Sequence, residues 1–149
     1  MNVLKIQTDI LKGLIKGGKP IYTTEKDGMV GLCPDSHCIV FCPNKDVYLK
    51  LSGRLLDTER LLNKVKDAEY KLSETTCYYD HILEGKNVRL MKVMTGERSA
   101  FINEKYTKYF DKDALYYVAS WSRPVCVYEH DVMVGIIFPI LLRDGDYDD

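Results

Sequence analysis

The sequence predicts an α+β fold made of two β-α-β-β-β units, with paired helices packed on curved antiparallel sheets. Two stretches carry this prediction. Residues 99–142 read as a short apolar strand, a short helix and three further strands, and residues 3–42 read in the same order of elements. The two stretches share almost no identical letters, so the repeat is one of element order rather than of sequence.

In the C-terminal unit, the apolar run 99–102 predicts a strand. Asn103 follows it and is a good N-cap, because its side-chain oxygen can accept a hydrogen bond from a free N–H of the first helical turn. We therefore expect a helix over 104–112. Three β-rich runs complete the unit and predict strands at 115–120, 125–129 and 133–142.

In the N-terminal unit, Val3 to Ile6 predicts a short strand. Thr8 is then expected to cap a helix over 9–16, which Gly17 and Gly18 end. The expected apolar stripe of this helix consists of Ile10, Leu11, Leu14 and Ile15. The strands that follow are expected at 21–24, 29–33 and 37–42, and Asp27-Gly28 is a strong hairpin signal between the first two.

The region between the units is less regular. Val47 to Leu51 alternates as a strand should, and Asp57 can cap a helix over 58–67. Two longer strands are expected at 70–83 and 88–94, joined by a four-residue loop. Residues 1–142 are thus predicted to form a single domain, and residues 143–149 an acidic tail with four aspartates.

Length and charge limit the function classes. A chain of 149 residues is long enough for one well-buried core. The formal net charge of −1 predicts no global attraction to nucleic acid or to an anionic membrane, so such an affinity needs a local cluster. No secretory leader or membrane-spanning run is visible, and the cysteine count of five is odd. We expect a cytoplasmic protein with free thiols and no membrane partner.

Two cysteine arrangements suggest chemistry. Cys33, Cys38 and Cys42 lie near His37, but their spacing lacks the tight pairs typical of zinc sites, and buried structural cysteines are the favoured interpretation. Cys77 with His81 could form a nucleophile and base, but no third group is marked to orient the base. We expect no catalytic residue, no metal and no cofactor. A small Cys/His enzyme or a zinc protein stays as an alternative.

The lysines of the two predicted helices suggest a binding surface. Lys105, Lys108 and Lys112 share one face of the second helix, and Lys12 and Lys16 share a face of the first. If the units pack about a pseudo-twofold axis, the five lysines form one basic strip that can meet phosphates without reading sequence. The alternative interpretation is an ordinary solvated helix face, whose field nearby acidic residues dilute.

The closing stretch resembles the end of a bacterial DNA sliding clamp. Three segments carry this resemblance, namely Phe101-Ile-Asn-Glu-Lys-Tyr106, Ser122-Arg-Pro-Val-Cys-Val127 and Gly135-Ile-Ile-Phe-Pro-Ile140. The resemblance covers about the last third of the chain, while the first forty residues match in pattern only. Clamp rings contain several such domains in each subunit, whereas this chain is long enough for one.

The resemblance implies a non-enzymatic role. A clamp-like domain of this kind would contact duplex DNA non-specifically through Lys12, Lys16, Lys105, Lys108 and Lys112. It would otherwise tether replication-type proteins through apolar grooves. A phage or a mobile element is a source that fits the single-domain form. The alternative within the same fold is a protein-interaction module that never contacts DNA and binds protein partners or a second copy of itself.

Overall fold

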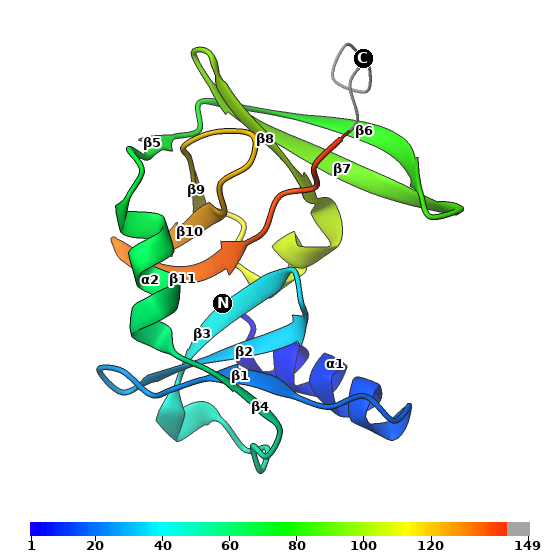
Figure 1. Cartoon of the computed structure of the whole chain (residues 1–149), viewed down its shortest axis with the longest axis vertical. Helices are drawn as coiled ribbons and strands as arrows, with labels where there is room; N and C mark the ends of the chain where they lie inside the picture. Colours follow the sequence, from blue (N-terminus) through cyan, green and yellow to red (C-terminus); the bar gives the residue numbers. More distant parts are fainter. Residues whose placement is uncertain (143–149) are drawn as a thin grey trace.

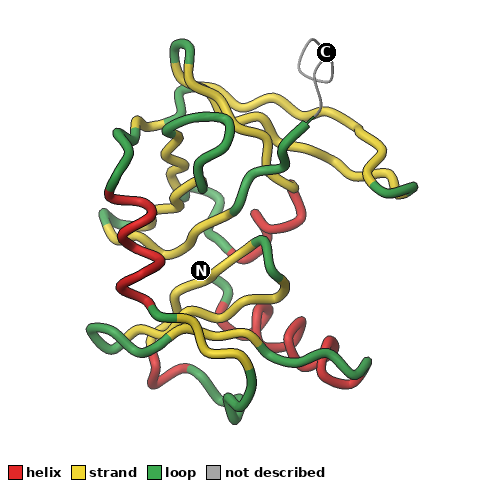
Figure 2. Tube along the Cα trace, viewed as in Figure 1, coloured by secondary structure: helices red, strands yellow, loops and turns green. Residues whose placement is uncertain are grey.

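The computed structural model describes residues 1–142, and the expected acidic tail at 143–149 lies outside the described residues (Figure 1). The chain forms few helices and many strands, as Figure 2 shows. The helices are α1 (Val3–Ile15), the 3₁₀ helix η1 (Asn44–Asp46), α2 (Thr58–Lys66) and the 3₁₀ helix η2 (Glu104–Tyr109). The strands are β1 (Ile21–Thr23), β2 (Met29–Asp35), β3 (Cys38–Pro43), β4 (Arg54–Leu56), β5 (Lys71–Leu72), β6 (Thr75–Leu83), β7 (Lys86–Thr95), β8 (Arg98–Asn103), β9 (Leu115–Val118), β10 (Val125–Glu129) and β11 (Val132–Ile137).

The strands form a large and a small sheet. The large sheet has the order β4-β1-β2-β3-β11-β10-β9-β5, and the small sheet has the order β6-β7-β8. At the centre of the large sheet β3 and β11 pair antiparallel, with Ile39 opposite Ile136. The hairpin strands of each unit therefore extend outward from this pair in the same order. The mixed α+β class is confirmed.

The large sheet is covered on both faces. Because side chains alternate along a strand, Cys38, Val40 and Cys42 of β3 contribute to one core, together with α1 and η2, while Ile39 and Phe41 contribute to another. Helix α2 covers the second face, the one away from α1, through Leu61 and Val65. The small sheet lies on the same side as α1 and η2, because side chains from β7 and β8 belong to the first core. Among the described residues, no helix is long and apolar enough to cross a membrane.

The expected strand from Val3 to Ile6 is wrong, because α1 already begins at Val3. The side chain of Asn2, not Thr8, caps this helix and accepts a 3.0 Å hydrogen bond from the N–H of Lys5. The first unit therefore lacks its leading strand.

The expected apolar stripe of α1 is also partly wrong. Ile10 is buried, but the side chains that α1 buries beside it are Ile6 and Gln7, while Leu11 and Ile15 of the expected stripe are exposed.

The expected strand from Val47 to Leu51 is wrong as well. The side chain of Gln7 takes the place of a strand partner for this segment: its Oε1 accepts hydrogen bonds from the N–H groups of Tyr48 (2.6 Å) and Leu49 (3.3 Å), and its Nε2 donates to the carbonyl of Asp46 (2.9 Å). The chain thus satisfies these backbone groups without joining a sheet.

Three further expected features are shorter than predicted. The helix expected over 104–112 is a 3₁₀ helix that ends at Tyr109. The last strand ends at Ile137, since Pro139 has no N–H to donate to a ladder. The loop between β6 and β7 has two residues rather than four, because Leu83 and Lys86 already pair and both turn residues have positive φ. The Asp27-Gly28 hairpin and the helix capped by Asp57 are confirmed.

Candidate nucleic-acid interface

The lysines predicted to contact DNA lie on two helices that touch. The N–H of Asn2, the N-cap of α1, donates a 2.8 Å hydrogen bond to the carbonyl of Tyr109, the last residue of η2. Both helices pack against the same core and on the same face of the large sheet. The sequence therefore correctly predicted that the two helices lie next to each other.

On α1, the cationic side of the helix faces η2. Lys5, Lys12 and Lys16 follow at intervals of seven and four residues, so they share one side of the helix with Asp9. Asp9 accepts a hydrogen bond from the phenol of Tyr109 at 2.7 Å, which locates this side of α1 against η2. Lys5, which is not among the five lysines predicted from the sequence, forms an i,i+4 ion pair with Asp9 at 3.3 Å.

In η2 the sequence Lys105-Tyr106-Thr107-Lys108-Tyr109 forms two equivalent groups. A 3₁₀ helix has three residues per turn, so residues three apart lie one above the other. Lys105 lies 5.1 Å from the ring centroid of Tyr106, and Lys108 lies 5.2 Å from that of Tyr109. The helix begins at the cap of Asn103, whose side-chain oxygen accepts from the N–H of Lys105 at 3.1 Å.

Each of these groups binds one carboxylate. The Tyr106 phenol donates to Asp35 at 2.5 Å, and the Lys105 ammonium lies 3.6 Å from the same oxygen. In the second group, Lys108 lies 3.2 Å from the oxygen of Asp9 that Tyr109 also binds. Lys105 and Lys108 are therefore compensated by acidic side chains.

Burial and hydrogen bonding shift the pKa values of Asp9 and Tyr109 in opposite directions. Partial burial acts to raise the pKa of Asp9, but the hydrogen bonds from Tyr109, Lys108 and Lys5 outweigh it, so the pKa lies below the ordinary value of 3.8. Burial, with the hydrogen bond to Asp9 second, raises the pKa of Tyr109 above its ordinary value of 10.0. The phenol therefore stays a hydrogen-bond donor, and Asp9 stays charged, throughout the neutral range.

The other three predicted lysines have no acidic partner among the described residues. Within residues 1–142, Lys12, Lys16 and Lys112 form no ion pair. Lys112 lies beyond the end of η2, so the expected spacing of three and seven residues along one helix is wrong for it. It nevertheless lines two surface clefts together with Lys108. The five lysines thus differ: three are unpaired and two are bound to carboxylates.

A cleft of about 650 Å³ lies next to Lys105, and no local sequence pattern predicts it. The turn between β2 and β3 and the start of η2 form a polar wall, and the segment after β11 forms an apolar wall. In the polar wall the N–H of His37 donates to Asp35 at 2.8 Å, and Ser36 lies 3.2 Å from the His37 ring. Residues on the two walls include Ser36, His37, Lys105, Phe138, Pro139 and Leu141.

Four of the five cysteines are buried, and Cys77 on β6 is the exception. Burial raises the pKa of Cys33 and Cys42 to about 12 and that of Cys126 to about 11, and it raises that of Cys38 well above its ordinary value. These thiols therefore hold their protons at neutral pH. Among the described residues, no group of three or more His, Cys, Asp or Glu side chains is arranged to hold a metal ion.

Comparisons with protein-family models, with curated proteins and with solved structures find no match to this chain.

Proposed function

We propose that this chain is a non-enzymatic, clamp-like domain that holds duplex DNA non-specifically on the surface of α1 and η2. The observation that carries the proposal is the contact between the two helices, which joins the lysines of both units on one side of the large sheet. Unpaired ammonium groups on such a surface attract phosphates and carry no information about base sequence.

Lys105 and Lys108, which form ion pairs with carboxylates, can also take part in binding phosphates. Because Tyr106 and Tyr109 also hydrogen-bond the two carboxylates, each carboxylate keeps a donor if its lysine turns toward a phosphate. The unpaired residues Lys12, Lys16 and Lys112 would make the first contacts.

The test is duplex binding measured by fluorescence anisotropy over a series of salt concentrations. We expect log K to fall linearly with log salt, with a slope of about −4.5 for five phosphate contacts. Replacing Lys12, Lys16 and Lys112 by Glu should weaken binding at least tenfold and flatten the slope. The matched control is Lys66→Glu on α2, which covers the opposite face and should leave binding unchanged. Binding that the triple variant leaves intact would exclude this surface.

The second candidate is a protein-interaction module, and the 650 Å³ cleft favours it. One wall combines the basic side chains of Lys105 and His37 with the carboxylate of Asp35, and the other offers Phe138 and Leu141 to apolar groups. An extended peptide with both polar and apolar side chains fits this combination. Peptides selected by display against the purified chain should bind the wild type and lose at least tenfold in affinity for Leu141→Asp, a change at a side chain that is 59% exposed. Under this function, duplex DNA would not bind.

A further inference from the structure

A second basic site lies on the opposite face of the large sheet, away from α1 and η2. A cleft of about 460 Å³ opens between β4 and α2. Three cationic side chains line it, Arg54 from β4 and Arg60 and Lys64 from α2, above the apolar side chains of Leu56 and Leu61. The size is that of a small-molecule site rather than of a duplex-binding surface.

The two elements hold the three cations on one concave surface. Arg60 and Lys64 are four residues apart on α2, so they are neighbours on one side of that helix. Arg54 is fixed on the other wall, because β4 pairs in parallel with β1 and the N–H of Arg54 donates to the carbonyl of Pro20 at 3.0 Å.

These cations are not compensated by acidic partners. Among residues 1–142, no ion pair or side-chain hydrogen bond forms on Arg54, Arg60 or Lys64. The acidic residues nearest along the chain are engaged elsewhere. Glu59 binds Lys26 at 2.5 Å, and the Asp57 carboxylate, which lines the cleft, accepts the N–H of Glu59 at the start of α2. The cleft therefore holds three cationic side chains against the single carboxylate of Asp57, and this excess of positive charge favours an anionic ligand.

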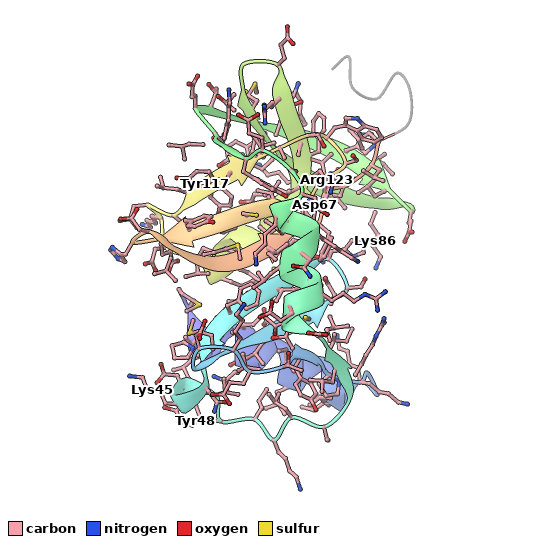
Figure 3. All side chains as sticks on the ribbon, turned by 60° about the vertical axis from the view of Figure 1, so that its left-hand side comes forward. Lys45, Tyr48, Asp67, Lys86, Tyr117 and Arg123 are labelled. Atoms are coloured by element: carbon pink, nitrogen blue, oxygen red, sulfur yellow. The ribbon has the colours of Figure 1, made fainter. Side chains whose placement is uncertain are left out.

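Arg123 extends the basic site toward the end of α2. Its guanidinium donates to the carbonyl of Lys64 at 3.3 Å, and Figure 3 shows Arg123 beside this end of the helix. On the other side, a second cavity of about 230 Å³ shares Arg54, Leu56, Leu61 and Lys64 with the cleft. The rest of its lining is mostly apolar, with Ile21, Ile39 and Phe138 among it, and Asp35 and Ser36 are the polar residues in this part. The combined space can therefore take an anionic group at one end and an apolar or planar group at the other.

We propose that this cleft binds a phosphorylated small molecule, with its phosphate groups on Arg54, Arg60 and Lys64. Guanidinium groups bind phosphate oxygens in a bidentate manner, and three cations match a group with several charges better than a single carboxylate. The adjoining apolar cavity would receive the remainder of the ligand, so a nucleotide and a free polyphosphate share the chemistry that this site recognises.

The test is isothermal titration calorimetry of the full chain at low salt and without magnesium, with inorganic tripolyphosphate, ATP and adenosine as probes. We expect tripolyphosphate and ATP to bind and adenosine not to bind. Tighter binding of ATP than of tripolyphosphate would identify a nucleotide site, and equal binding a polyphosphate site. No binding of tripolyphosphate at millimolar concentration would overturn the proposal.

Charge-neutralising variants then locate the site. Arg54→Gln, Arg60→Gln and Lys64→Gln should each weaken tripolyphosphate binding several-fold, and together at least 30-fold, with an unchanged melting temperature because all three side chains are exposed. Lys66→Gln, on the same helix but outside the cleft, is the matched control and should leave binding unchanged. Binding that survives the triple variant, or that is lost with Lys12→Gln and Lys16→Gln, would place the anion elsewhere and refute this site. The DNA proposal is tested by other residues, so the two can fail separately.

Discussion

The phenol of Tyr109 donates a 2.7 Å hydrogen bond to the carboxylate of Asp9, and this contact joins η2 to α1. The same carboxylate also binds Lys108 at 3.2 Å and Lys5 at 3.3 Å. Three donors therefore converge on one side chain that is only 16% exposed. Because the contact holds the two helices against each other, it also sets the spacing of the lysines on the candidate interface.

Tyr109→Phe should lower the free energy of unfolding by about 2 kcal/mol, since it removes a hydrogen bond to a charged acceptor while leaving the ring in place. Urea denaturation followed by circular dichroism measures this. Tyr48→Phe is the control. Its side chain is 76% exposed, and we expect a change of less than about 0.5 kcal/mol. Equal effects of the two changes would mean that the Tyr109 hydrogen bond adds no stability.

The stabilisation by Asp9 should depend on pH. The pKa of Asp9 in the folded chain lies below 3.8, so the folded state favours the charged form more than the unfolded state does. The contribution is fully present above about pH 4, where the unfolded chain is also ionised. It is lost as the pH falls through the lower folded-state value. Wild type and Asp9→Asn should therefore differ most in urea stability at pH 6–7, and the difference should shrink as the pH falls below 3.8. A difference that is constant with pH would contradict the charged role of Asp9.

Local signals predicted the elements that depend on local chemistry. Asp57 before an amphipathic run marked α2, and Asp27-Gly28 marked a hairpin whose two turn residues have positive φ. At the N-terminus two local signals competed. Asn2 and Thr8 are both good caps, and the choice between them depends on whether Ile6 is buried, which is a property of the whole fold. The sequence therefore could not place the start of α1.

The candidate site was predictable only in part. The adjacency of α1 and η2 followed from the repeated order of elements, and the lysines could be read directly. Their compensation could not be read, because Lys108 pairs with Asp9 and Lys105 with Asp35, residues that are distant in sequence. The cleft beside Lys105 likewise combines segments from three parts of the chain. The repeated Lys-Tyr pair, three residues apart, was the one visible sign of a 3₁₀ helix with two equivalent groups.

Two glycines should respond in opposite directions to alanine. At Gly135, an added Cβ would lie 2.3 Å from Cζ of the buried Phe110 and 3.1 Å from the carbonyl oxygen of Ile39, so Gly135→Ala should destabilise the fold by about 2 kcal/mol. At Gly13, within α1, no atom lies within 4 Å of an added Cβ. Gly13→Ala should therefore stabilise by up to about 1 kcal/mol, because glycine is a poor helix former. Thermal denaturation of both variants measures the two shifts. An unchanged or raised melting temperature of Gly135→Ala would contradict the packing described there, and a lowered one of Gly13→Ala would contradict the open space at Gly13.

We expect the side chain of Gln7 to stabilise residues 47–51, the segment after η1, more than it stabilises α1. Its side chain is 6% exposed, and it bonds backbone groups of Asp46, Tyr48 and Leu49. Gln7→Met keeps the volume but leaves these groups without their partner, so we expect a loss of about 2 kcal/mol.

Native-state hydrogen exchange separates this effect from a general loss of stability. The Tyr48 amide should be protected in the wild type and should exchange much faster in Gln7→Met, by a larger factor than amides in β3. Thr8→Ala, which changes an exposed neighbour on the same helix, is the control and should leave the Tyr48 amide protected. If the Tyr48 amide and the β3 amides accelerate equally in Gln7→Met, the segment is held by packing of Leu49 and Leu51 against the core rather than by the glutamine.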